Sequence, residues 1–164
     1  MIRAIVTFGY VGLIPRAPGT FGTLAALPVG YALHVLGGFP LLVIATLAVF
    51  VLGYWATVRA IADDPTADPG WIVVDEVVGL WIALFPLSFG LWHAGAAPML
   101  FPWPGWVGAF VMFRLFDILK PWPVSRVDAM HGAAGVMLDD VAAGVMAALV
   151  VALAAFIAHG MMGA

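Results

Sequence analysis

Five carboxylates lie within or beside segments that otherwise consist of apolar residues: Asp75, Glu76, Asp117, Asp139 and Asp140. Ionised side chains are costly in a bilayer, so they usually face a protein interior and have a function. Gathered in one low-dielectric site, five acids would repel one another strongly, and a hard divalent cation would relieve that repulsion. Because the chain offers oxygen ligands and no cysteine, Mg²⁺ is favoured over Zn²⁺.

A second explanation for these acids needs no ligand, because acidic residues near a helix N-terminus complement the helix dipole or cap the helix. It accounts for one residue more easily than for two adjacent pairs and a fifth acid. Mg²⁺ takes only one or two carboxylates directly, so one acid is free to act as a base. The candidate metal ligands are Glu76, Asp117, Asp139 and Asp140, and the candidate catalytic residues are Asp75, Glu76, Asp139 and Asp140.

Arg114, Asp117 and Lys120 recur every three residues, so on a helix they line one face over about 9 Å. Arginine binds phosphate through two hydrogen bonds and lysine binds it as a point charge, so Arg114 and Lys120 are candidate phosphate-binding residues. A ladder of ion pairs near the membrane interface is the alternative. The two interpretations are compatible, because Asp117 can orient Arg114.

Three further residues are candidates for substrate binding. Thr20 and Thr23 belong to a glycine-rich segment, residues 18–23, which could direct backbone N–H groups at an anion or could simply cap the following helix. His131 is the only histidine expected on the same side of the membrane as the acids. It could donate a proton to a leaving oxygen, or it could be a loop histidine without a role.

The composition places these residues in a membrane protein, because 65% of the chain is hydrophobic, 9% is charged and the mean hydropathy is +1.12. A chain of 164 residues is expected to form a single domain, residues 1–164. Six basic residues spread along the chain and a net charge of -3 argue against nucleic acid as a partner. The lack of cysteine excludes disulfides and a cysteine nucleophile.

Hydropathy and the Gly and Pro clusters predict an all-α, polytopic bundle of about five membrane helices. Four segments approach the length of about 20 residues that a crossing needs: 41–58, 72–92, 105–120 and 139–158. Residues 24–36 form a fifth, shorter helix. Residues 4–14 are shorter still and are expected to be interfacial or re-entrant.

If these helices alternate in direction, the loops around residues 1–23, 59–71 and 121–138 share one side of the membrane. That side holds five basic residues, Arg3, Arg16, Arg59, Lys120 and Arg126, and is therefore predicted to be cytoplasmic. The same alternation brings all five acids to that side. We therefore expect one polar site at the inner leaflet.

Several blocks together resemble the phosphatidylglycerophosphatase A family. They are Pro18-Gly19-Thr20, Asp75-Glu76-Val77-Val78-Gly79, the run from Phe113 to Pro123 with its Arg114, Asp117 and Lys120, and Asp139-Asp140 followed by Ala143-Gly144. The blocks cover residues 8 to 150, and the run FRLFDILKPWP is the most specific of them. The short N-terminus departs from the longer polar leader of some members.

The resemblance implies a Mg²⁺-dependent phosphatase of the bacterial inner membrane that converts the phospholipid phosphatidylglycerophosphate to phosphatidylglycerol and phosphate. Direct attack by water and an aspartyl-phosphate on Asp75 or Asp139 are both open routes. A cation- or proton-coupled transporter is the alternative function, because acids within membranes also mark ion pathways. The residues leave open how many metal ions bind and whether the protein is a homo-oligomer.

Overall fold

The computed structural model of the chain describes residues 1–64, 66 and 69–162, with side chains described up to residue 158. These residues form seven α-helices and one 3₁₀ helix, and no strand occurs among them. The all-α prediction is therefore confirmed.

The N-terminal segment is neither long nor straight. Helix α1 spans Ile2–Val6, and after a turn the 3₁₀ helix η1 spans Val11–Leu13. The backbone N–H of Val73 donates to the carbonyl of Val6 over 2.8 Å, so the segment is fastened to the residue that precedes helix α3, Val74–Ala83. Both pieces are far too short to cross a bilayer.

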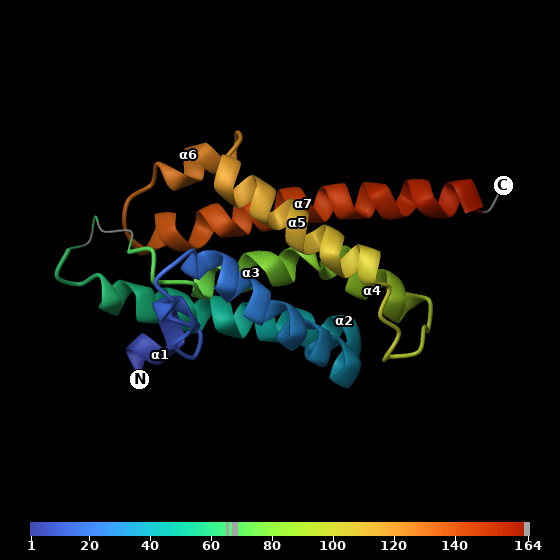
Figure 1. The fold of residues 1–164 in the computed structure, drawn as a ribbon, viewed down its shortest axis with the longest axis horizontal. Coiled ribbons are helices and arrows are strands. Elements are labelled where there is room, and N and C mark those ends of the chain that lie inside the picture. Colours follow the sequence, from blue (N-terminus) through green and yellow to red (C-terminus); the bar gives the residue numbers. More distant parts are fainter. Residues whose placement is uncertain (65, 67–68, 163–164) are drawn as a thin grey trace.

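Helix α2 spans Pro18–Ala60 but contains a break at Gly37 and Gly38, where the backbone leaves helical geometry. Gly38 has a φ of 62°, which glycine adopts without steric cost. Figure 1 shows the two arms of α2 side by side, joined by a turn at the end of the molecule opposite α1. The break predicted between residues 36 and 41 is therefore confirmed.

The first arm of α2 begins earlier than the sequence predicted. Residues 18–23 form its first turns rather than a loop, with Pro18 at the first helical position, where a missing N–H costs nothing. The Thr23 hydroxyl donates to the carbonyl of Gly19, 2.8 Å away, and no side chain caps the helix. The alternative in which Thr20 or Thr23 is the N-cap is therefore wrong.

The segment predicted as one helix over residues 72–92 is bent. Helix α3 spans Val74–Ala83, α4 spans Phe85–His93, and the two are inclined by 43°. Pro86 lies in the first turn of α4, and because it has no backbone N–H to donate, a continuous helix is interrupted there. Asp75 and Glu76 lie in the first turn of α3.

The last three helices complete the bundle. Helix α5 spans Trp103–Leu119 and ends at Lys120, which has left-handed backbone geometry before Pro121. A short helix α6, Val124–Asp128, leads into α7, Gly132–Met162. The α7 start lies seven residues before the predicted one, so Asp139 and Asp140 lie about two turns inside the helix.

Two helices, α2 and α7, are long and apolar enough to cross a membrane, and the bent α3–α4 pair would be a third. The prediction of about five crossings is therefore not confirmed by length and composition. The outward faces of α2 and α7 carry exposed apolar residues, among them Leu47, Val51, Leu149, Leu153 and Phe156. This is the pattern of a protein surrounded by lipid.

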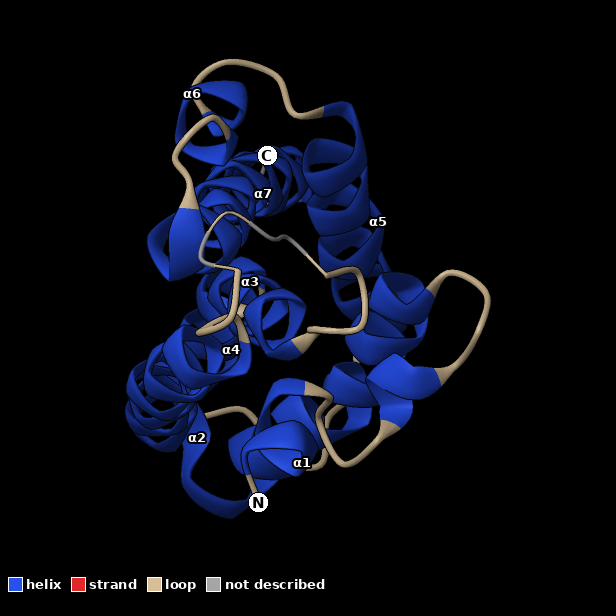
Figure 2. Cartoon of the chain, turned by 90° about the vertical axis from the view of Figure 1, so that its left-hand side faces the viewer, coloured by secondary structure: helices blue, strands red, loops and turns tan. Residues whose placement is uncertain are grey.

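Helix α3 occupies the centre of the bundle. Figure 2 views the molecule from the end at which α1 and α6 lie and shows α3 enclosed by α2, α5 and α7. Its buried residues Val77, Leu80 and Trp81 belong to the main core with Trp106 and Phe113 of α5. The acidic first turn of α3 is thereby held inside the protein.

Candidate functional site

Three carboxylates from two helices form the centre of the site. Ligand oxygens of Asp75, Glu76 and Asp140 all lie within 4.8 Å of one another. Asp75 and Asp140 are buried, and Glu76 Oε2 and Asp140 Oδ1 have no hydrogen-bond partner. We refer to Asp75, Glu76 and Asp140 as the acid triad.

The acid triad forms because α3 and α7 approach closely at two glycines. A Cβ added at Gly144 would lie 3.0 Å from the Cα of Gly79, and one added at Gly79 would lie 2.6 Å from the carbonyl oxygen of Asp140. Gly79 lies three residues after Glu76, and Gly144 lies four residues after Asp140. Residues three or four apart are neighbours on a helix, so the glycine contact brings the acidic turn of α3 next to the acidic turn of α7. Close helix contact at small residues is typical of membrane proteins.

Glycines of both arms of α2 allow α2 to pack closely against the start of α3. Gly22 of the first arm lies against Val73, and Gly53 of the second arm lies against Val74. A Cβ at Gly19 would overlap the Glu76 carboxylate and lie 3.4 Å from Nη1 of Arg114. The start of α2 therefore forms a wall of the site.

Arg114 of α5 connects this wall with the acid triad. It forms an ion pair with Asp117, and its Nη1 lies 4.0 Å from Glu76 Oε1. Its terminal nitrogens lie 3.5 Å from the Thr23 hydroxyl and 3.4 Å from the Thr20 hydroxyl, while Nε has no partner. Arg114 is thus held near the acids and keeps donors available.

Lys120 lies in different surroundings. Its Nζ donates to Asp139 Oδ2 over 2.7 Å and also pairs with Asp128 at the end of α6. Partial burial disfavours its charge, but the hydrogen bonds and charges of Asp128 and Asp139 outweigh that effect and raise the pKa of Lys120. The lysine therefore stays protonated, and it bridges α6 and α7.

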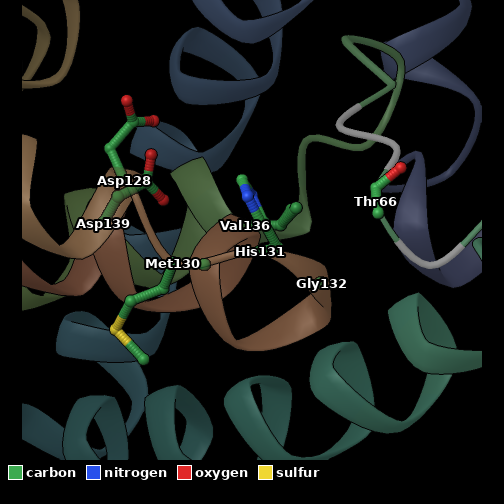
Figure 3. A pocket seen from close by; sticks show the side chains of 8 residues that line it. Thr66, Asp128, Met130, His131, Gly132, Val136 and Asp139 are labelled. Carbon is green, nitrogen blue, oxygen red and sulfur yellow. The ribbon is translucent and has the colours of Figure 1, made fainter.

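A polar cavity of about 60 Å³ adjoins Asp139. Asp128 and His131 line it together with Gly132 and Gly135, and in Figure 3 the His131 ring lies between the two carboxylates and Thr66. The His131 side chain is exposed. The structure thus places His131 beside the site but outside the acid triad.

All five predicted acids occur in one region, but they fall into distinct groups. Asp75 and Glu76 lie with Asp140, whereas Asp117 pairs with Arg114 and Asp139 pairs with Lys120. Electrostatic repulsion nevertheless links Asp75 with Asp139, and Asp117 with both Glu76 and Asp140. The roles assigned to these residues, and to Thr20, Thr23 and His131, remain predictions.

Two residues of the site were not among the sequence candidates. Asp128 shares Lys120 with Asp139, and the signal for it was a lone acid after the Pro-Trp-Pro turn, in a segment treated as a loop. Gly19 lies against Glu76 and Arg114, and in the sequence it stands out only within the glycine-rich segment and the Pro18-Gly19-Thr20 block. Glu76 and Arg114 lie far from Gly19 in sequence, whereas Lys120 is only eight residues from Asp128 and is brought to it by the turn after α5.

The donor set of the acid triad fits a hard divalent cation. Its oxygens are close enough to share one ion, and two of them are buried without partners, which is costly for ionised groups. The helix-dipole explanation applies to Asp75 and Glu76 in the first turn of α3 but not to Asp140, two turns inside α7. An oxygen-only set of this kind suits Mg²⁺ or Mn²⁺.

Comparison with known proteins gives one family and several relatives. The family model described as phosphatidylglycerophosphatase A matches residues 4–155. A phosphatidylglycerophosphatase A of Escherichia coli is 37% identical over 139 residues, covering 84% of this chain and 73% of the relative. One of Haemophilus influenzae is 40% identical over 141 residues, covering 85% and 80%.

A third relative carries a different name. A Bacteroides thetaiotaomicron protein, provisionally named a phosphatidylinositol-3-phosphatase, is 38% identical over 151 residues, which cover 89% of this chain and 88% of the relative. No solved structure matches the chain. The relatives' names thus describe phosphatases of phosphorylated glycerophospholipids.

Proposed function

The chain belongs to the phosphatidylglycerophosphatase A family, and we propose from this premise that it removes the terminal phosphate of phosphatidylglycerophosphate to give phosphatidylglycerol. The single observation that carries the proposal is the acid triad, whose oxygens lie within 4.8 Å of one another beside Arg114. Phosphoryl transfer needs such a combination of metal ligands and a cation.

We propose that Asp75, Glu76 and Asp140 hold Mg²⁺, with Asp117 and Asp139 close enough to assist. When bound, Mg²⁺ stabilises negative charge on a transferring phosphoryl group and orients the reacting oxygens. Asp75 thereby joins the ligands predicted from the sequence, while Asp139 and Asp117 have cations as their nearest partners.

The chain's own residues then have separate tasks. Arg114 neutralises the terminal phosphate, and the Thr20 and Thr23 hydroxyls orient its guanidinium. A carboxylate oxygen of Glu76 or Asp140 that does not bind the ion can accept a proton from an attacking water. An aspartyl-phosphate on Asp75 or Asp139 is the alternative route.

The topology supports a site at the cytoplasmic face of the bacterial inner membrane. We propose five crossings, formed by residues 18–36, residues 39–60, the bent α3–α4 pair, α5 and α7. In this topology one side of the membrane carries α1 and α6, and with them Arg3, Arg16, Arg59, Lys120 and Arg126. A phospholipid head group at that interface can reach the acid triad.

Phosphate release in detergent tests the proposal. The purified protein should release phosphate from phosphatidylglycerophosphate when Mg²⁺ is present, and EDTA should lower the rate by about 10³-fold or more. Added Mg²⁺ in excess of the chelator should restore activity. A protein that releases no phosphate with Mg²⁺ present would favour the transporter alternative, and full activity in EDTA would exclude the metal.

A further inference from the structure

The two cations of the site do not share a partner among the described residues. Arg114 pairs with Asp117 and reaches the threonines at the start of α2. Lys120 pairs instead with Asp128 of α6 and Asp139 of α7. Each cation is therefore fixed in its own group of side chains.

The two cations also differ in position. Lys120 follows the last residue of α5 and is six positions after Arg114, which corresponds to about 9 Å along the helix axis. The side chain of Arg114 is 15% exposed and that of Lys120 is 30% exposed. Arg114 is thus the inner cation, beside the acid triad, and Lys120 is the outer cation at the end of the helix. The two cations therefore offer two separate positions for anionic groups.

The lipids in the relatives' names share a feature that suits two separate cations. Phosphatidylglycerophosphate and phosphatidylinositol 3-phosphate each carry a phosphodiester next to the diacylglycerol and a phosphomonoester further out on a polyol. The polyols differ, but the pair of phosphates is common to both lipids. A site for such lipids needs two anion-binding positions.

Resting on the proposed function, we propose that Lys120 binds the phosphodiester of the lipid, while Arg114 serves the terminal phosphomonoester, so that Lys120 selects lipids that carry both groups. Asp128 pairs with Lys120 and therefore competes with the phosphodiester for it. A cavity of about 60 Å³ adjoins this group, because Asp128 and Asp139, the two partners of Lys120, both line it.

Inhibition by two small molecules that each resemble one part of the substrate distinguishes the role of Lys120 from that of Arg114. Glycerophosphoglycerol, the deacylated product, contains only the phosphodiester, and inorganic phosphate resembles only the released group. Both are assayed as inhibitors of phosphatidylglycerophosphate hydrolysis by the full chain in detergent. Lys120→Met should raise the inhibition constant of glycerophosphoglycerol by about tenfold or more and leave that of phosphate within about twofold.

Asp128→Asn keeps Lys120 and should change the inhibition constant of glycerophosphoglycerol in the direction opposite to Lys120→Met. Removing the competing carboxylate should lower the inhibition constant of glycerophosphoglycerol by about threefold, again without changing that of phosphate. The inference is overturned if Lys120→Met weakens both inhibitors equally, or if Asp128→Asn weakens the diester. A wild-type protein that hydrolyses no phosphatidylglycerophosphate refutes the proposed function itself, which is a different result.

Discussion

Asp140→Asn should abolish turnover and leave the helical bundle folded. Asp140 belongs to the acid triad, its Oδ1 has no partner, and asparagine matches its shape while removing the charge that a divalent cation requires. We expect phosphate release from phosphatidylglycerophosphate to fall by about 10³-fold or more. The rate is measured at saturating Mg²⁺ in detergent.

The same variant should be at least as stable as the wild type in the absence of metal. Asp140 repels Asp75, Asp117 and Asp139, so removing its charge relieves a cost of the folded state. Asp63→Asn is the matched control, because it makes the same change at an exposed position and should alter neither rate nor melting temperature. If Asp140→Asn turned over substrate at the wild-type rate, Asp140 would not be part of the active site.

Gly79→Ala should impair both stability and catalysis. The new methyl group would lie 2.6 Å from the carbonyl oxygen of Asp140 and 2.7 Å from Cζ of Phe113, so α3 and α7 must separate. Overpacking of this kind costs about 1–3 kcal/mol. A displacement of about 1 Å in the acid triad would lower the rate by about 10²-fold.

Gly108→Ala is the matched control for this helix contact. Gly108 lies on α5, and a Cβ added there has no neighbour within 4 Å, so activity and melting temperature should not fall. Both variants are compared by thermal denaturation and by phosphate release. Normal activity of Gly79→Ala would show that the spacing of α3 and α7 does not control the acid triad.

The contrast between these glycines shows what the sequence could and could not predict. Gly53, Gly79, Gly108 and Gly144 are alike as small residues within apolar segments, and nothing in the sequence distinguishes their surroundings. The structure brings Gly79 onto Gly144 and leaves Gly108 in open space. Which glycine meets which helix depends on rotation about the helix axis, and hydropathy contains no information on it.

Helix ends were predictable only where backbone chemistry marks them. The break at Gly37 and Gly38 follows from two adjacent glycines, and it occurs where expected. The start of α7 was placed too late, because Gly132 and Gly135 are typical of a loop although residues 132–138 contain no proline and no polar side chain. The bend at Pro86 was missed, because the apolar run is continuous through it.

The grouping of the acids required the fold. Adjacent pairs such as Asp139-Asp140 look equivalent in sequence, but neighbouring residues on a helix point about 100° apart. Asp140 therefore faces α3 and joins the acid triad, while Asp139 turns to Lys120. Sequence reasoning predicted that the acids meet in one region and could not separate the acid triad from the acids that pair with Arg114 and Lys120.

Mn²⁺ binding measured by electron paramagnetic resonance on the detergent-purified protein tests the central claim most directly, because it detects the bound ion without relying on turnover. The acid triad predicts saturable binding that is lost in Asp140→Asn and kept in Asp63→Asn. Equal Mn²⁺ affinity in the wild type and Asp140→Asn would contradict the claim that these helices form a divalent-cation site.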